Sequence, residues 1–406
     1  MSRLTGIVGN RKAATNCYFM LFAQQYGGPY SGGICSISTG DIFSHRRQGL
    51  LTQVFSQQDI NILKGHTAIG HISSLEDDIQ PMVIDTNWGE VVICGDCSKE
   101  WADRLIDYLK NASGRFVFVI KKWMQDNCGP WAFLILYQNH LYAIRGDGRK
   151  PLCFGRLNRN GFVVASQENA IATIAGTLLR HMEPGEIVLL NPRTCKSYFC
   201  NYPEPNSKRC IHEIIFIQNP AARWGGIQIQ NLRIEIGRNL GTLIKHDIDL
   251  IVPVPLGGTS YALGVAGVLK KRGLEFNPCG FTKVSYPRPK GMPISMVLTV
   301  TNPHGFMGKR ILIINDTLQS GFEISYLTEL CREAGAKEVY VAVASLKLSN
   351  CAYGGEVSAN LVGQNKCYEQ IAQALGADDF VALTPIDICR AINISRSVFC
   401  TECLEE

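Results

Sequence analysis

The segment KRILIINDTLQSG, residues 309–321, decides the fold class of the second half of this chain. Its four apolar residues Ile311 to Ile314 predict a buried strand, and the polar residues after them predict a loop. The next segment, ISYLTELCREAGA (324–336), has helical apolar spacing, and KEVYVAVAS (337–345) is typical of another strand. Strand, loop, helix and strand in this order predict a βαβ unit within a parallel sheet.

The loop after Ile314 is a candidate site for a phosphorylated sugar. In open α/β sheets, ligands bind outside the carboxyl ends of the strands. Small hydroxylated residues ahead of a helix offer amide groups and the helix dipole to an anion. Asp316 can accept hydrogen bonds from sugar hydroxyls, so the loop favours a ribose 5-phosphate. The alternative is an ordinary turn in which Asp316 and Thr317 serve only as caps. The candidate ligand-binding residues are Asn315, Asp316, Thr317, Leu318, Gln319, Ser320 and Gly321.

We expect the whole chain to consist of two domains and a C-terminal tail. Residues 1–205 contain short apolar runs that end in Gly, Asn or Asp turns, which predicts a mainly β domain. Within it, residues 132–148 have the pattern of a hairpin. The polar segment NYPEPNSKR (201–209) is a predicted linker. We therefore expect a second domain over 206–389 and a cysteine-bearing tail over 390–406.

The composition excludes several classes of protein. Of the 406 residues, 46% are apolar and 18% charged, which excludes global disorder and predicts two or three domains. No apolar run approaches the ~20 residues of a membrane helix, and we expect no membrane association. A net charge of +5 gives no argument for nucleic-acid binding. The first 20 residues lack a signal-peptide pattern, so we expect a cytoplasmic protein whose 16 cysteines are thiols or metal ligands.

The segment ILIINDTLQSG resembles the phosphoribosyl pyrophosphate motif of type I phosphoribosyltransferases, and the flanking sequence resembles the amidophosphoribosyltransferase family, which opens purine synthesis. The resemblance implies two α/β domains, an N-terminal Ntn-hydrolase-like glutaminase sandwich and a phosphoribosyltransferase domain with a parallel sheet. The similar segments of the first half are 5–9, 24–34, 49–55, 69–71, 129–136, 149–157, 162–166 and 182–190, and those of the second half are 212–233, 250–258, 311–321 and 376–383.

The pair Cys400 and Cys403 forms a C-x-x-C motif near the end of the sequence. This spacing lets two thiolates converge on one metal, but a tetrahedral site or a cluster requires four ligands. The resemblance supplies Cys210 and Cys351 as the other two, and it implies a 4Fe–4S cluster that joins the linker, the transferase domain and the tail. Zinc is the alternative metal, and four unrelated buried thiols are the alternative without a metal.

The first domain departs from the family at its glutaminase residues. The resemblance implies an N-terminal cysteine whose own amine acts as base, but Thr5 stands there with four residues ahead of it. Thr5 is a catalytic candidate only if trimming frees its amine. Ser73 replaces the arginine that clamps the glutamine carboxylate. Cys94 and Gly95 stand where the family has the Asn-Gly pair that holds the oxyanion. Since one lost oxyanion donor raises a barrier by about 2.7–4 kcal/mol, we expect a pseudo-glutaminase.

The transferase residues are better retained. The family's acidic pair is Asn315 and Asp316, and the PLGG loop has Leu256 where the family has an acid. Residues 283–291 correspond to the loop that closes over the substrate in the family. Lys283 and Tyr286 match family residues there and are further ligand candidates. Mg²⁺ is a candidate cofactor together with the phosphoribosyl ligand, although Leu256 conflicts with ordinary handling of Mg²⁺-pyrophosphate.

Three functions remain open from the sequence. The first is an iron–sulfur amidophosphoribosyltransferase homologue without glutaminase and with impaired transferase activity, which binds a phosphoribosyl ligand as a regulatory subunit. The second is an active phosphoribosyltransferase that uses ammonia or another nucleophile. The third is a structural or redox-sensing protein built around the cluster. The family implies a homo-oligomer, and the first function also suits a complex with an active paralogue.

Overall fold

The computed structural model describes residues 2–25, 30–157, 161–200, 208–224, 226–269, 273–283, 297–351 and 360–405. Most of the predicted linker lies outside these ranges, because residues 201–207 are not among them. Residues up to Cys210 make up most of one compact unit, and residues from Ile211 make up most of a second. In the described ranges, no helix is both long and apolar enough to cross a membrane.

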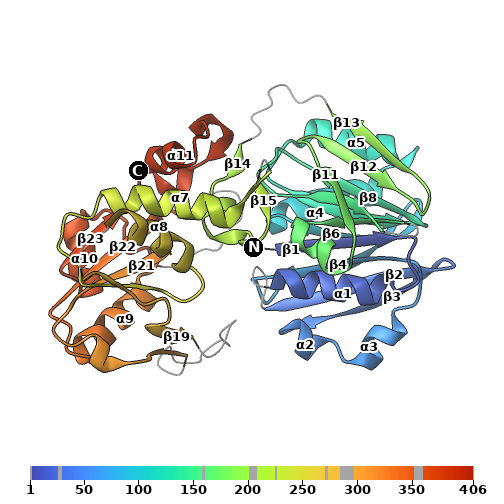
Figure 1. Cartoon of the computed structure of the whole chain (residues 1–406). Helices are drawn as coiled ribbons and strands as arrows, with labels where there is room; N and C mark the ends of the chain where they lie inside the picture. Colours follow the sequence, from blue (N-terminus) through green and yellow to red (C-terminus); the bar gives the residue numbers. More distant parts are fainter. Residues whose placement is uncertain are drawn as a thin grey trace. The chain divides into compact units, whose positions relative to one another are not determined.

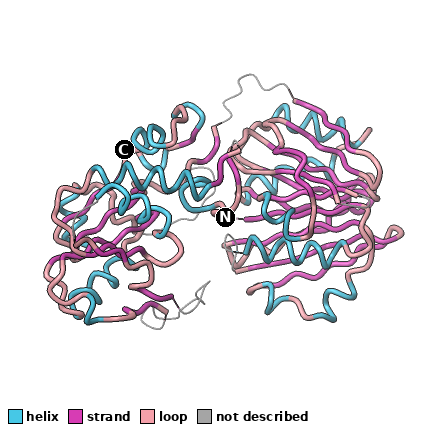
Figure 2. The backbone as a smooth tube through the Cα atoms, viewed as in Figure 1, coloured by secondary structure: helices cyan, strands magenta, loops and turns pink. Residues whose placement is uncertain are grey.

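The first unit contains a seven-stranded sheet with the order β11-β9-β10-β1-β4-β2-β3. Figure 1 labels five of its strands, and Figure 2 draws strands in magenta. Its neighbouring strands all run antiparallel. Every residue of the central strands β1 and β4 is buried, which places both faces of the sheet against other layers. The strands are β1 (Ser2–Val8), β2 (Ser31–Ser38), β3 (Asp41–Gln48), β4 (Thr67–Ser73), β9 (Cys153–Arg156), β10 (Phe162–Ala165) and β11 (Thr177–His181).

A second, six-stranded sheet of this unit has the order β13-β12-β8-β7-β6-β5. The hairpin predicted within 132–148 is confirmed as β7 and β8, which pair antiparallel with Tyr137 opposite His140. Gln138 between them has φ 53°, as tight two-residue hairpin turns require. The strands are β5 (Met82–Thr86), β6 (Gly89–Asp96), β7 (Ala132–Tyr137), β8 (His140–Arg145), β12 (Glu186–Leu190) and β13 (Cys195–Phe199).

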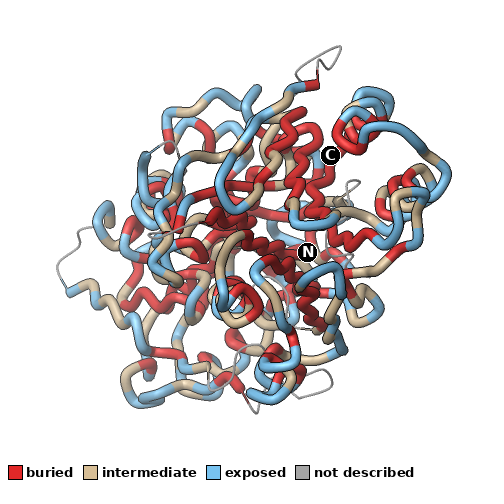
Figure 3. The backbone as a smooth tube through the Cα atoms, turned by 90° about the vertical axis from the view of Figure 1, so that its right-hand side faces the viewer, coloured by how far each residue is buried: buried red, intermediate tan, exposed pale blue. Residues whose placement is uncertain are grey.

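The two sheets form the inner layers of a four-layer sandwich. One buried cluster joins side chains of both sheets, for example Leu4 and Ile69 from the first with Leu134 and Val188 from the second. A cluster on the outer face of the first sheet includes α1 (Ala13–Gln24), α2 (Leu51–Val54), α3 (Gln57–Ile62) and α6 (Glu168–Thr173). A third cluster covers the second sheet with α4 (Lys99–Asn111) and α5 (Phe116–Asp126). The buried segments are red in Figure 3.

The second unit confirms the predicted parallel sheet. Its strand order is β18-β17-β21-β22-β23, and the neighbouring strands are all parallel. The strands are β17 (Leu250–Pro253), β18 (Glu275–Phe276), β21 (Arg310–Leu318), β22 (Glu338–Leu346) and β23 (Asp379–Ala382). The inner strands contain continuous apolar runs, such as Ile311–Ile314 of β21, because helices cover both faces of the sheet.

One face of this sheet packs on α7 (Ile229–Thr242), α8 (Thr259–Leu269) and α11 (Pro385–Ala391). The other face packs on α9 (Phe322–Glu333) and α10 (Tyr368–Leu375). The first cluster also takes in Phe399, Cys403 and Leu404 of the tail. The remaining strands are β14 (Arg209–Cys210), β15 (Arg223–Trp224), β16 (Ile227–Gln228), β19 (Phe281–Lys283), β20 (Leu298–Val300) and β24 (Phe399–Cys400).

Candidate functional site

Strand β21 extends further than the sequence predicts. We expected it to end at Ile314, but Asn315, Thr317 and Leu318 still pair with β22, opposite Val343, Ser345 and Leu346. The parallel neighbour supplies backbone partners that no local pattern can reveal, so polar residues continue the strand. The loop of the candidate phosphate cradle is therefore short, with Gln319 and Ser320 ahead of the helix.

The cradle is held by hydrogen bonds at both ends. Thr317 Oγ1 lies 2.7 Å from Ser345 Oγ, and the carbonyl of Gln319 accepts from the amide of Val362 at 2.8 Å. Gly321 caps α9 in the left-handed conformation, with φ 78°. The turn therefore leads directly into a helix of 12 residues, whose N-terminus favours an anion.

The predicted residues of this cradle differ in what they can offer a ligand. Leu318 is buried in the core with 1% of its surface exposed, so only its backbone is available. Ser320 is exposed, and Thr317 and Gln319 are half-buried. Their hydroxyl and amide groups suit a phosphate ester.

Asp316 is the acidic group of this edge. Its Oδ1 accepts from the amide of Thr317 at 2.6 Å, and the residue is half-buried. Burial raises the pKa of Asp316 to about 6, and the nearby charge of Arg233 opposes the shift. A carboxylate at the carboxyl end of a parallel strand can accept bonds from sugar hydroxyls.

A second loop, after β17, lies against the end of β21. A Cβ atom added to Gly257 would lie 2.5 Å from Asp316 Oδ2 and 2.9 Å from Asn315 Oδ1. One added to Gly258 would lie 2.0 Å from the carbonyl oxygen of Ile314. The two glycines allow the loop to approach both polar side chains. Leu256, just before them, has φ 73° and is 61% exposed.

Lys283 reaches the first turn of α9. Its Nζ lies 3.1 Å from Glu323 Oε1, so the structure brings this predicted residue close to the cradle. Tyr286, the other candidate of segment 283–291, lies outside the described residues.

Thr5 lies in the middle of β1, where it is fully buried between Gly70 of β4 and Ala165 of β10. The residues ahead of it belong to the same strand. The amide of Leu4 donates to Ser166 Oγ at 2.9 Å, and the carbonyl of Leu4 accepts from the amide of Ser166 at 3.0 Å. The nitrogen of Thr5 is therefore a peptide nitrogen, and it cannot act as a base in this chain.

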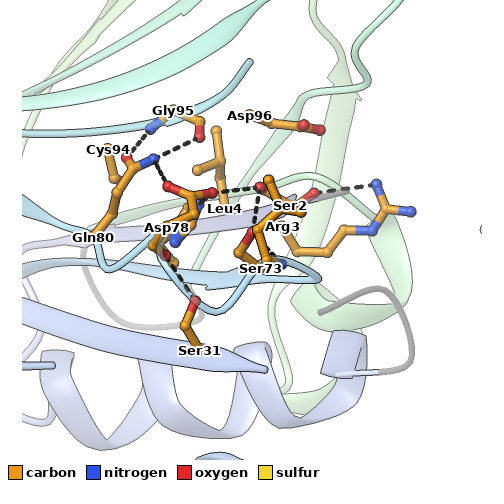
Figure 4. Close-up of polar contacts among 12 residues, drawn as sticks. Ser2, Arg3, Leu4, Ser31, Ser73, Asp78, Gln80, Cys94, Gly95 and Asp96 are labelled. Atoms are coloured by element: carbon orange, nitrogen blue, oxygen red, sulfur yellow. Dashed lines mark hydrogen bonds and ion pairs between the residues drawn. The ribbon is translucent and has the colours of Figure 1, made fainter. Parts of the chain in front are cut away.

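Ser73, which stands in the position of the arginine that clamps the glutamine carboxylate, is hydrogen-bonded within the protein (Figure 4). Ser2 Oγ donates to Ser73 Oγ at 3.3 Å, and Ser2 Oγ also lies 3.2 Å from Asp78 Oδ2. Both serines are buried. The start of β1 therefore occupies the groups that the resemblance assigns to glutamine binding.

The expected oxyanion donor is also engaged. The amide of Gly95 donates to Gln80 Oε1 at 2.7 Å, and Gln80 Nε2 donates to Asp78 Oδ1 at 2.6 Å (Figure 4). Cys94 is buried, and burial first of all raises the pKa of its thiol well above the usual value. A thiol in that state cannot stabilise an oxyanion as an amide does.

Sequence reasoning missed Asp78 and Gln80, which organise this network. Both lie in the segment EDDIQP (76–81), whose polar residues show no periodic pattern and therefore look like a surface loop. Asp78 also lies 3.6 Å from Nε2 of the fully buried His71. Burial lowers the pKa of His71, against the opposing effect of Asp78.

Three of the four predicted cluster ligands lie close together in the second unit. Burial raises the pKa of Cys403 to about 12, and the neighbouring thiols Cys351 and Cys400 contribute in the same direction. The amide of Ile211, next to Cys210, donates to the carbonyl of Cys400 at 3.3 Å. Cysteine thiolates are the usual ligands of an iron–sulfur cluster.

All sixteen cysteines are free thiols. In the part of the chain that the structure describes, no three His, Cys, Asp or Glu side chains are placed to hold a single metal ion. This applies to the carboxylate edge around Asp316 as well as to the cysteines.

No protein-family model matches the chain. Curated relatives nevertheless align along nearly all of it. The amidophosphoribosyltransferase of Methanocaldococcus jannaschii is 26% identical over 96% of this chain and 93% of its own length. That of Bacillus subtilis is 27% identical over 96% of this chain and 89% of its own length. A chloroplastic amidophosphoribosyltransferase of Arabidopsis thaliana is 27% identical over 98% of this chain and 78% of its own length.

Solved structures show the same fold. The allosteric regulatory enzyme of purine biosynthesis superimposes with a TM-score of 0.89, at 24% identity over 99% of this chain and 95% of that one. The glutamine phosphoribosylpyrophosphate amidotransferase of B. subtilis, complexed with ADP and GMP, gives 0.88 over 99% and 96%. The first unit therefore has the Ntn-type glutaminase sandwich and the second the phosphoribosyltransferase fold.

Proposed function

Since this chain is a homologue of the amidophosphoribosyltransferases of purine biosynthesis along nearly its whole length, we propose that it is a member without glutaminase activity that binds a phosphoribosyl ligand. The observation that carries the first part is the position of Thr5. The nucleophile of an Ntn hydrolase depends on its own free amine, whereas Ser2–Leu4 continue β1 ahead of Thr5.

Two further contacts support the loss of glutamine chemistry. Ser73, in place of a bidentate arginine, is bonded to Ser2, and the amide of Gly95 is bonded to Gln80. A donor that is already engaged inside the protein must lose that bond before it can stabilise an oxyanion. Nucleophile, clamp and oxyanion donor are thus altered together.

The second unit supports ligand binding. The cradle formed by Thr317, Gln319 and Ser320 leads into the N-terminus of α9, and Asp316 stands beside it. This arrangement offers hydrogen-bond donors to a phosphate and an acceptor to ribose hydroxyls.

The proposal includes a 4Fe–4S cluster held by Cys210, Cys351, Cys400 and Cys403. The proximity of Cys351 and Cys400 to Cys403 supports it, and so does the hydrogen bond between the chain next to Cys210 and Cys400. The thiols would have to move closer together to bind one cluster. The cluster would cross-link the tail to the second unit. Free thiols throughout the chain suit a reducing, cytoplasmic environment.

We propose that this chain assembles either with an active paralogue, which a regulatory role requires, or with further copies of itself. Co-purification of the tagged chain with an untagged active paralogue tests the former. A monodisperse assembly of this chain alone would favour the latter.

The decisive experiment measures glutamate release from glutamine and ligand binding with the same purified protein. We expect no glutaminase activity and saturable binding of a ribose 5-phosphate ester that Thr317→Val and Ser320→Ala weaken about tenfold each. Glutamate release at ordinary enzyme rates would overturn the loss of glutaminase. Pyrophosphate release from phosphoribosyl pyrophosphate with ammonia would instead establish the active transferase.

A further inference from the structure

Strand β3 forms an open edge of the first unit. It lies at the end of the seven-stranded sheet and pairs with β2 alone. Both strands are labelled in Figure 1. Native proteins often protect such an edge with a short strand, a proline or a bulge, because unpaired backbone groups accept a further strand. β3 is eight residues long, contains no proline and keeps an unbroken register with β2.

The turn between β2 and β3 determines which backbone groups of β3 face outward. Thr39 and Gly40 have φ values of 49° and 100°, as a two-residue type I′ turn requires. Ser38 and Asp41 flank the turn and are partners in the register, so they form a hydrogen-bonded pair. Hydrogen-bonded residues alternate along an antiparallel strand. The backbone groups that point away from β2 therefore belong to Ile42, Ser44, Arg46 and Gln48.

In the described part of the chain, these outward groups have no backbone partner, because every backbone hydrogen bond of residues 41–48 belongs to the ladder with β2. An extended segment can therefore add to β3 without displacing a backbone hydrogen bond. Such additions derive their affinity from main-chain hydrogen bonds, and the side chains decide which segment fits.

The side chains of β3 divide between the two faces of the sheet. Phe43 packs against the cluster on the outer face, whereas Ile42 packs against the cluster between the two sheets. Since successive side chains of a strand alternate, Asp41, His45 and Arg47 lie on the outer face with Phe43.

Asp41 and Arg47 mark the two ends of this outer row. Both are exposed, and within the described residues neither side chain forms a hydrogen bond or an ion pair. They are six residues apart in one strand, or about 20 Å, so they cannot pair with each other. β3 thus carries an acid at its start and an unpaired arginine near its end.

A second copy of β3, added antiparallel about a twofold axis at Ser44, places these charges opposite each other. Asp41 then faces Arg47 of the partner subunit, and the twofold axis repeats this pair at the other end. On the same face, Phe43 lies opposite His45 of the partner subunit. Opposite charges and aromatic pairs directly across two strands are favourable. About six backbone hydrogen bonds form in this register, through the outward residues Ile42, Ser44 and Arg46.

Other partners and registers fit β3 less well. With the axis at His45, Phe43 faces Arg47 of the partner subunit, and Asp41 meets no cation. An acidic segment of another protein would suit Arg47 but would place like charges at Asp41, which is unfavourable. The strand is therefore most complementary to itself.

We infer that β3 is the surface on which a second copy of this chain docks, so that the seven-stranded sheets of two chains join across a twofold axis. Such an interface is isologous, because both copies contribute the same residues. The inference goes beyond the proposed function, since it names the surface through which copies of this chain assemble. It does not involve the ligand of the second unit.

Sedimentation equilibrium of the full chain at about 1–200 µM measures this association. Because an edge pair buries little area, we expect a Kd of about 10 µM. Asp41→Arg places like charges opposite each other at both ends of the paired strands and should weaken the dimer about tenfold. The double variant Asp41→Arg with Arg47→Asp restores opposite charges and should return to within about threefold of the natural Kd. Since these two residues of one chain cannot reach each other, only pairing between copies explains such a rescue.

Ser44→Pro tests the backbone part of the interface. It removes the central outward amide, and proline is tolerated on an edge strand where the amide faces solvent. We expect this variant to stay folded in thermal denaturation and to lose the dimer even at about 200 µM. Ser44→Ala keeps the amide and is the matched control, which should dimerise like the natural chain. If the proline variant does not fold, the charge variants still decide.

A natural chain that stays monomeric at about 200 µM would overturn the inference. An assembly whose mass is unchanged in both Ser44→Pro and Asp41→Arg would also overturn it, because the copies would then meet on another surface. Failure of the double variant to recover would overturn the antiparallel register. None of these results alters the expected absence of glutamate release or the expected ligand binding, so the proposed function is tested separately.

Discussion

At the scale of a single residue, the ionised carboxyl group of Asp316 lowers the stability of the folded state. Its carboxyl group is half-buried beside the amide of Thr317 and the loop glycine Gly257. Burial raises its pKa to about 6, so ionisation at neutral pH is unfavourable in the fold. A carboxyl group with such a raised pKa is typical of a functional site.

The pH dependence of stability follows from this shift. Because the folded pKa lies above the unfolded value of about 3.9, the folded state binds more protons between about pH 4 and about pH 6. The contribution of Asp316 to stability therefore falls as pH rises through this window. We expect Asp316→Asn to be about 1–2 kcal/mol more stable than the natural chain at pH ~8 and equally stable at pH ~4, with partial exposure limiting the gain.

Urea denaturation at both pH values checks this expectation, and Glu329→Gln on the exposed face of α9 is the control. The control should shift stability by less than about 0.5 kcal/mol. A stabilisation by Asp316→Asn that is the same at both pH values would contradict the assignment to ionisation.

At the scale of elements, the beginning of β1 is part of the core and not a removable extension. Leu4 is fully buried in the cluster between the two sheets. We expect Leu4→Ala to lower the free energy of unfolding by about 2–5 kcal/mol, because it leaves a cavity between the sheets. Leu75→Ala, at a leucine that is 55% exposed, should change it by less than about 0.5 kcal/mol.

Denaturation of both leucine variants gives the measurement. A loss below about 1 kcal/mol for Leu4→Ala would mean that the residues ahead of Thr5 contribute little to the fold. The residues ahead of Thr5 could then be removed without unfolding the first unit.

Helices α7 and α8 pack closely because glycine stands where their backbones meet. A Cβ atom on Gly237 of α7 would lie 2.2 Å from the carbonyl oxygen of Tyr261, whereas one on Gly267 of α8 would meet nothing within 4 Å. We expect Gly237→Ala to destabilise the second unit by about 2 kcal/mol or more. Gly267→Ala should stabilise it by about 0.5–1 kcal/mol, since alanine is the better helix former.

Thermal denaturation of the two glycine variants distinguishes packing from helix propensity. The two substitutions are chemically identical and both lie in helices of the same pair. Stabilisation by both substitutions would show that α7 and α8 can move apart without lowering the stability of the second unit.

At the scale of the whole molecule, the tail is held to the second unit by apolar contacts as well as by the proposed cluster. Phe399 and Leu404 are buried in the same core cluster as α7 and α8. The tail should therefore stay attached to the core in part when the cluster is lost.

Metal analysis of anaerobically purified protein tests the cluster. We expect equal amounts of iron and acid-labile sulfide, both lost in Cys400→Ser and Cys403→Ser. Cys389→Ser removes a buried thiol of the same hydrophobic core that is not a predicted ligand, so this variant should keep the iron. Zinc without sulfide would support the alternative metal site, and protein without either metal would contradict both.

The sequence by itself determined the parallel sheet, the 132–148 hairpin and the departures at Thr5, Ser73 and Leu256, because strand and helix periodicity and residue identity are local properties. Only the tertiary structure decided that β21 continues through Leu318 and that Gln80 and Ser2 engage the groups that the family resemblance assigns to glutamine chemistry. Those contacts join residues as far apart as Ser2 and Asp78. No local pattern encodes such pairs, since they depend on which strands become neighbours in the sheet.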